Sequence, residues 1–111
     1  MPRCGNASSP PEMPRSIRYH PLFEADVIGA AAWYDARHPA IGSAFIAEVS
    51  RAVDQLTSDP ERRSLFDLGV RYWPVSRFPF VVLYDLYGHE LLVLGVMHTA
   101  QESRKWLAER L

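Results

Sequence analysis

Two apolar runs separated by a short turn decide the fold of this chain: Phe80-Val81-Val82-Leu83-Tyr84, then Tyr87-Gly88-His89, then Leu91-Leu92-Val93-Leu94-Gly95-Val96. Runs this continuous predict strands that are covered, at least in part, on both faces. Between them, Gly88 can adopt a positive φ, which suits a tight hairpin turn. The stretch therefore predicts two paired strands, at about 79–86 and 90–98.

Two further strands are predicted on the N-terminal side of this hairpin. The pattern at 70–76 is extended and precedes the hairpin directly. Much earlier, Ile17 and Tyr19 alternate with polar residues, the period-2 pattern of a short strand that Pro21 ends. These segments extend the predicted sheet to three or four strands.

Helical periodicity occupies the chain between the first strand and the second. Apolar residues recur at spacings of three and four after Pro21, which can stand first in a helix, with acidic residues such as Asp26 in its first turn. A second apolar stripe runs from Ile41 to about Leu56. Pro39 separates the two stripes, so the two helices should form an antiparallel hairpin.

A last amphipathic helix is predicted at 99–111. Thr99 can cap it, with Glu102 three residues on in the capping-box position. Its expected anchors are Trp106, Leu107 and Leu111. The whole order predicts an α+β fold: an N-terminal strand, an antiparallel helical hairpin packed on an antiparallel sheet of three to four strands, and a short C-terminal helix.

The chain has the length of one domain, with 111 residues of which 48% are hydrophobic. Residues 1–15 contain four prolines and almost no bulky apolar side chain, which is the composition of a tail. They are predicted to be a disordered leader, or the product of a translation start placed too early, with Met13 as the more natural first residue. The single domain then comprises residues 16–111.

The charge balance argues against a protein built to grip nucleic acid by its phosphates. Lys plus Arg total 12 and Asp plus Glu total 13, so there is no basic excess, although a local basic face remains open. The one cysteine, Cys4, cannot form an internal disulfide, and the sequence contains no metal or cofactor motif. No apolar stretch approaches the ~20 residues that span a bilayer. A cytoplasmic protein without membrane contact is expected.

No standard catalytic motif is present, so the candidates are single residues. His98 ends an apolar strand, where it is either a general base or a residue that closes the strand and bonds the start of the last helix. Arg71 and Arg77 lie among aromatic residues, which suits phosphate gripping and base stacking. In the alternative, both arginines are solvated or paired with Asp67 and Asp85.

Other residues near these candidates are assigned to the core or to solvent. Trp73 and Phe80 are predicted core residues. Arg104 on the last helix, with Arg110 beyond it, either extends a basic face or supplies the favourable charge near a helix C-terminus. The choice between these two alternatives stays open at the level of sequence.

Several motifs share their order and spacing with one family. In the helices they are Trp33-Tyr34, Ile41-Gly42-Ser43-Ala44-Phe45 and the segment 56–60. In the strands they are Val70-Arg71-Tyr72-Trp73-Pro74-Val75 and, most specifically, Arg77-Phe78-Pro79-Phe80-Val81-Val82-Leu83-Tyr84 followed by Leu94-Gly95-Val96-Met97-His98. Over about residues 16–107 the chain resembles the RelE/ParE superfamily of toxins.

The resemblance implies a toxin of a type II toxin–antitoxin system, neutralised in a hetero-oligomer by a small cognate antitoxin. RelE-like members cut messenger RNA on the ribosome. ParE-like members, such as plasmid-stabilisation toxins, are instead associated with inhibition of DNA gyrase and are not nucleases. Gln101 stands where the nuclease pattern often has an arginine, and the closing helix contains no tyrosine. The sequence is therefore closer to the ParE side.

Three hypotheses for function remain open. In the first, the chain is a ParE-like inhibitor that arrests growth without a cofactor, with DNA gyrase as the expected target. Its target surface would be formed or supported by Arg71, Arg77, Tyr84, His98 and Arg104. In the second, the chain is an enzyme, a ribosome-dependent mRNA endonuclease whose catalysis is carried by Arg71, Arg77 and His98. In the third, it keeps the fold and has lost toxicity.

Overall fold

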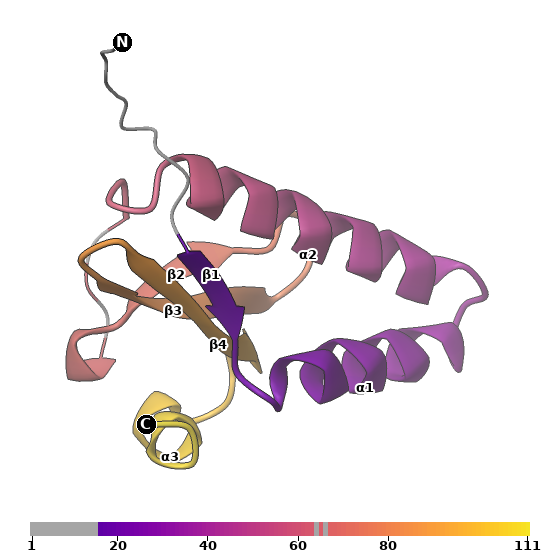
Figure 1. Cartoon of the computed structure of the whole chain (residues 1–111). Helices are drawn as coiled ribbons and strands as arrows, with labels where there is room; N and C mark the ends of the chain where they lie inside the picture. Colours follow the sequence, from indigo (N-terminus) through magenta and orange to yellow (C-terminus); the bar gives the residue numbers. More distant parts are fainter. Residues whose placement is uncertain (1–15, 64, 66) are drawn as a thin grey trace, which may run out of the picture.

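A computed structural model of the protein describes residues 16–63, 65 and 67–111, and the predicted leader at 1–15 lies outside them. The elements follow one another in the predicted order (Figure 1). They are β1 (Ser16–Tyr19), α1 (Phe23–Asp35), α2 (Ile41–Ser58), the 3-10 turn η1 (Asp67–Gly69), β2 (Arg71–Pro74), β3 (Phe80–Tyr87), β4 (Glu90–His98) and α3 (Ser103–Ala108). The α+β fold predicted from the sequence is confirmed.

The sheet is built around the hairpin of β3 and β4. β2, β3 and β4 form the predicted antiparallel meander, and β4 spans the predicted 90–98. Gly88 occupies the β3–β4 turn with a φ of 56°. β1 pairs with β4 in parallel, which gives the strand order β1-β4-β3-β2. β2 is an edge strand and ends at Pro74, since proline has no N–H to continue the ladder.

Helices cover both faces of this sheet (Figure 1). α1 and α2 pack on one face, and α3 packs on the other. Alternate residues of β3 show the division, because side chains of a strand point to opposite faces. Val82 and Tyr84 lie in the cluster beneath the helical hairpin, whereas Val81 and Leu83 lie in the cluster that contains Trp106. Coverage on both faces explains why the strand sequences are almost continuously apolar.

The two helices of the hairpin approach each other closely at a glycine. α1 begins at Phe23 instead of at the predicted Pro21, which lies in the turn before it. At the start of α2, the N–H of Gly42 donates to Asp35 Oδ1 at 2.8 Å. A Cβ at Gly42 would overlap the carbonyl oxygen of Ala31 and the Asp35 side chain, so any larger residue would push the helices apart.

β4 contains a bulge next to Gly95, a second glycine at a position of close approach. The register of β3 against β4 shifts at 83–84, so that Leu94 is an extra residue in the ladder. Gly95 follows with a φ of 152°, and a Cβ there would overlap the side chains of Arg110 and Asp26. The carbonyl oxygen of Leu94 accepts a hydrogen bond from Arg110 Nη1 at 3.1 Å. The bulge therefore opens the strand to side chains from two distant parts of the chain.

A buried ion pair between Asp26 and Arg110 makes this connection. The two side chains are 14% and 6% exposed, and Asp26 Oδ1 accepts from Arg110 Nη2 at 2.8 Å. Asp26 Oδ2 accepts from Arg110 Nη1 and from the backbone N–H of Val96, the latter at 3.0 Å. The guanidinium carbon also lies 3.8 Å from the ring centre of Trp106. Arg110 therefore does not extend a basic face, and its guanidinium binds Asp26 instead of serving as a free charge near the C-terminus of α3, the other alternative that the sequence suggested.

The closing helix is shorter than predicted. α3 begins at Ser103 rather than at Thr99, whose backbone N–H donates to the turn before β3 and whose side chain caps no helix. Trp106 and Leu107 are buried, as predicted. Leu111 is 59% exposed, so the prediction that it anchors the helix was wrong. Tertiary hydrogen bonds from the loop at 99–102 to β4 and the β2–β3 turn replace the predicted cap.

Removing one member of the Asp26–Arg110 pair should destabilise the fold strongly, because the other charge would stay buried without a counter-ion. Asp26→Ala is expected to lower the free energy of unfolding by about 3 kcal/mol. The double variant Asp26→Ala/Arg110→Met should recover a large part of this loss, since no charge is then left buried. Glu24→Ala on the exposed side of α1 is the control, expected to cost less than ~1 kcal/mol. Urea denaturation measures all three, and a similar small effect for Asp26→Ala would contradict the assignment.

Candidate partner-binding site

A groove of about 620 Å³ opens beside the free part of β4. β1 pairs with β4 only as far as Val93, so the described part of the chain places no strand beside the rest of β4 on that side. α1 forms one wall of the groove, and α3 with the residues after it forms the other. We call it the aromatic groove after five rings among its lining residues, which are Trp33, Tyr34, Phe80, His98 and Trp106.

Trp33 is the exposed tryptophan of this groove, at 53%. Its ring meets Tyr34 edge-on, with centroids 5.2 Å apart, and the guanidinium of Arg37 lies 3.5 Å from its centre. Tyr34 in turn contacts Phe78 at 5.0 Å, at the margin of the core. Because its neighbours already position Trp33, a partner could bury this large ring at a small cost in conformational entropy.

Side chains cover the polar backbone groups along the free edge of β4. The N–H of Val96 donates to Asp26, and the N–H of His98 donates to Gln101 Oε1 at 3.1 Å. His98 Nδ1 accepts the N–H of Ala100 at 2.9 Å. His98 therefore closes the strand and bonds the loop before α3, which is the structural alternative that the sequence left open for it.

The charged groups of the aromatic groove are poorly arranged for phosphate chemistry. Among the described lining residues, Arg110 is the one arginine or lysine, and both its Nη atoms bond Asp26. Glu109 adds a second acid to the lining. Cleavage of RNA needs a proton acceptor near the 2′-hydroxyl and a cation near the scissile phosphate. The arrangement favours the binding of a partner over phosphoryl transfer.

Two of the predicted target-binding residues lie away from this groove. Arg71 and Tyr84 are opposite each other across β2 and β3, and Arg71 Nη1 donates to the carbonyl oxygen of Arg63 at 2.6 Å. Tyr84 is fully buried, and its hydroxyl donates to the carbonyl oxygen of Pro60 at 2.8 Å. Burial raises the pKa of Tyr84, and the charge on Arg71 partly opposes this effect. Tyr84 can support a target surface only through the core.

Arg77 has a different partner from those considered in the sequence. It lies in the turn between β2 and β3, and its Nη1 is 3.4 Å from Glu48 Oε2 on α2. Asp85 instead accepts a backbone N–H of its own strand. The side chain of Asp67 lies outside the described residues. The turn is therefore tied to α2 through a glutamate.

The five predicted residues do not come together in one site. His98 lines the aromatic groove, and Arg104 is exposed on α3. Arg71 and Tyr84 lie on β2 and β3, and Arg77 lies in the turn between these strands. Sequence reasoning missed Glu48, although its place in the apolar stripe of α2, three residues after Phe45, was a usable signal. Trp33 gave no comparable signal, because a position off the apolar stripe of α1 indicates exposure and not a role in binding.

A second hollow lies along the outside of the helical hairpin. It measures about 420 Å³ and lies between α1, α2 and the end of β1. Three large apolar side chains on it are exposed, namely Tyr19 at 48%, Ile28 at 57% and Ile46 at 44%. We call it the hairpin groove. Apolar surface of this kind, grouped on one face, is typical of protein interaction sites.

Within residues 16–63, 65 and 67–111, no group of three or more His, Cys, Asp or Glu side chains is placed to hold a metal ion. No helix in the same segments combines the length and apolar character needed to cross a bilayer.

The fold and the grooves together define a small α+β domain with surfaces suited to macromolecular partners. The family described as "ParE toxin of type II toxin-antitoxin system, parDE" matches residues 17–103. The chain belongs to this ParE toxin family, which confirms the resemblance seen in the sequence.

The fold is similar to that of a solved structure entitled "Chromosomal ParDE TA system from P. aeruginosa". The TM-score is 0.68 at 19% sequence identity, and the match covers 77% of this chain and 96% of that chain. At this identity the likeness concerns the fold. A search of curated proteins with the sequence found no match.

Tyr84→Phe should lower the free energy of unfolding by about 1–3 kcal/mol, because the buried carbonyl of Pro60 would lose its donor. It should also remove a dependence on pH. Since the pKa of Tyr84 is raised in the folded state, unfolding releases a proton at alkaline pH. The stability that is present below the usual tyrosine pKa of 10.0 is therefore lost as the pH rises through the folded pKa. Denaturation at neutral and alkaline pH tests this, with Tyr19→Phe as an exposed control. Equal alkaline losses in wild type and Tyr84→Phe would contradict the prediction.

Proposed function

We propose that this chain is the toxin of a type II toxin–antitoxin pair and acts in the cytoplasm by binding a macromolecular target, with DNA gyrase as the expected target. Membership of the ParE toxin family supports the toxin role. The observation that carries the mode of action is the aromatic groove, whose lining contains the exposed Trp33 and one arginine, Arg110, with both Nη atoms bonded to Asp26. Such a surface suits an inhibitor that binds and does not cleave.

A ribosome-dependent mRNA endonuclease is the second candidate, because RelE-like members of the RelE/ParE superfamily have this activity. It would need Arg71, Arg77 and His98 to act on one phosphate. Arg71 bonds the backbone of Arg63, Arg77 pairs with Glu48, and His98 faces the aromatic groove. Their separation makes this candidate the weaker one. A homologue that keeps the fold without toxicity is the third outcome to test.

Inducing the chain alone in a bacterial host separates these candidates. Growth, bulk messenger RNA and plasmid supercoiling are followed in the same cultures. We expect growth arrest with intact RNA and relaxed plasmid. Early RNA fragmentation would establish the endonuclease, and uninterrupted growth of cells that contain folded protein would indicate the non-toxic homologue.

A substitution in the aromatic groove links the activity to the site. Trp33→Ala should abolish growth arrest with little change in thermal stability, because the ring is largely exposed and its loss leaves no core cavity. Tyr87→Ala removes a ring that is 55% exposed at the opposite end of β3, and it should leave the arrest unchanged. Equal toxicity of the two variants would show that the aromatic groove is not part of the surface that binds the target.

The antitoxin is expected to cover the hairpin groove with a helical or extended apolar segment. Without it, the exposed isoleucines should make the free toxin self-associate. Ile28→Lys/Ile46→Lys is therefore expected to keep the chain monomeric at concentrations where the wild type forms larger species. Light scattering measures this, with Leu68→Lys, an exposed site outside the groove, as the control. A wild type that stays monomeric at high concentration would contradict the prediction.

A further inference from the structure

The turn between β2 and β3 holds a charged cluster that the proposed activity leaves unused. A hollow of about 480 Å³ lies between this turn and α2, and the ionisable residues that line it are Glu48, Arg51 and Arg77. We infer that this arginine hollow binds the carboxylate of an acidic segment of a protein partner. The inference rests on the proposed function only in taking that partner to be the antitoxin.

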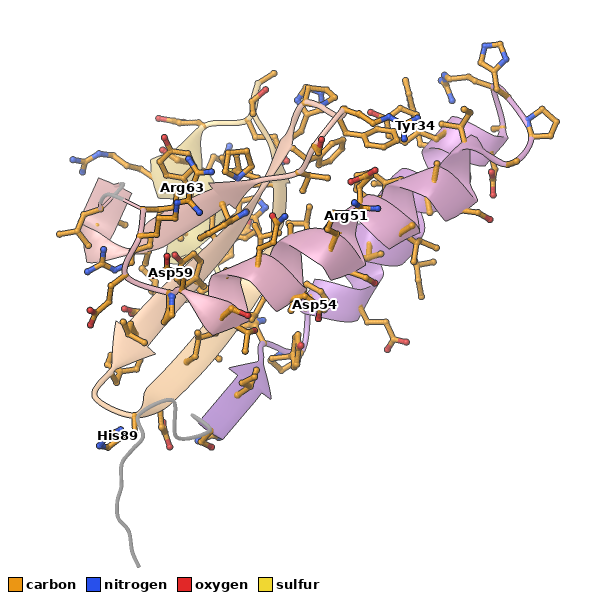
Figure 2. All side chains as sticks on the ribbon, turned by 90° about the horizontal axis from the view of Figure 1, so that it is seen from above. Tyr34, Arg51, Asp54, Asp59, Arg63 and His89 are labelled. Carbon is orange, nitrogen blue, oxygen red and sulfur yellow. The ribbon has the colours of Figure 1, made fainter. Side chains whose placement is uncertain are left out.

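The two arginines are accessible, whereas the glutamate between them is not. Arg77 Nη1 lies 3.4 Å from Glu48 Oε2, and Arg51 Nε lies 3.6 Å from Glu48 Oε1. The arginine side chains are 68% and 65% exposed, and the Glu48 side chain is 10% exposed. Figure 2 shows Arg51 midway along α2. One buried acid thus holds two exposed guanidinium groups in a single hollow.

The contacts inside the cluster leave most of its hydrogen-bonding capacity unused. Glu48 Oε1 is buried and accepts no hydrogen bond within the described structure. At 3.4 and 3.6 Å the ion pairs are long, and neither arginine forms the bidentate arrangement that a guanidinium makes with a carboxylate. Each guanidinium has five N–H donors in a fork that matches a carboxylate. A carboxylate entering the hollow could therefore bond both arginines without displacing Glu48.

The backbone at Arg77 is strained. Its φ is 73°, in a region that favours glycine and asparagine, and the turn is closed by the N–H of Phe78, which donates to the carbonyl oxygen of Val75 at 3.3 Å. The Arg77 side chain is 68% exposed and its contact with Glu48 is long, so this ion pair contributes little stability and does not offset the strain. An arginine held at such a position is better explained by what its side chain binds than by what it adds to the fold.

The charge of the hollow fits a carboxylate better than a nucleic-acid backbone. Two arginines and one glutamate leave a net charge of +1, which one carboxylate neutralises. A phosphate backbone would bring many negative charges to a chain whose own net charge is −1. Gln55 also lines the hollow. Its side-chain Oε1 already accepts a hydrogen bond from Trp73 Nε1 at 3.0 Å, so its side-chain Nε2 is the atom that can donate to a ligand.

The site can be tested with the full chain labelled with ¹⁵N and titrated with the peptide N-acetyl-Glu-Glu-Glu-amide at constant ionic strength. The Nε–H resonances of Arg51 and Arg77 should shift and saturate together. Arg77→Gly should weaken binding of the peptide about fivefold or more. The same variant should raise the Tm, because glycine adopts the positive φ without strain and Arg51 remains beside Glu48 as its counter-ion. A merely structural role for Arg77 predicts the opposite, a lower Tm.

Ala40→Gly is the matched control, since Ala40 also has a positive φ, 77°, but lies in the loop between α1 and α2. It should raise the Tm similarly and leave the peptide affinity unchanged. Titration with inorganic phosphate tests whether the hollow prefers a phosphate to a carboxylate. Phosphate should shift the Nε–H resonances of Arg51 and Arg77 less than the peptide does. The inference is overturned by the absence of a saturable shift, by unchanged affinity in Arg77→Gly, or by a stronger response to phosphate. None of these outcomes depends on whether the chain arrests growth, so failure of this inference can be distinguished from failure of the proposed function.

Discussion

The buried pair of Asp26 and Arg110 is the interaction on which the rest of the domain depends. It joins the start of α1 to the end of the chain, and both groups also bond the backbone of the β4 bulge. Because a buried charge without its partner is costly, the pair favours the arrangement in which these three segments lie together. Gly95 is required for the same reason, since the pair occupies the space that a Cβ would need.

This constraint also sets the properties of the aromatic groove. α1 and the residues after α3 form its two walls, and the ion pair fixes their separation. The groove exists because β1 ends early and leaves the last part of β4 without a strand beside it. Because Arg110 is bound to Asp26, the residues that line the groove present mainly aromatic rings and acidic groups. This arrangement supports the proposed role of the groove in binding a partner.

Glu48 and Asp26 illustrate how burial of the partner decides the role of an acid and arginine pair. Arg110 is almost completely buried, and both its Nη atoms bond Asp26 at short range. Arg77 and Arg51 remain largely exposed around Glu48, and their contacts with it are long. The first pair is enclosed within the fold, while the second leaves two guanidinium groups accessible to solvent. An acid on α1 and an acid on α2 thus form arginine contacts of two different kinds.

Local patterns in the sequence determined the element order, the meander and the limits of β4, because hydrophobic periodicity and turn residues act over a few positions. They also named His98 as a candidate site residue, and the structure places it in the lining of the aromatic groove. Only the tertiary structure decided that Tyr84 is buried, that Arg77 meets Glu48, and that α3 starts four residues after Thr99. The pairing of Asp26 with Arg110 spans 84 positions, and no local pattern reports a contact of that range. Such contacts arise when packed elements bring distant side chains together. Hydrophobic periodicity carries no information about which distant side chains will meet.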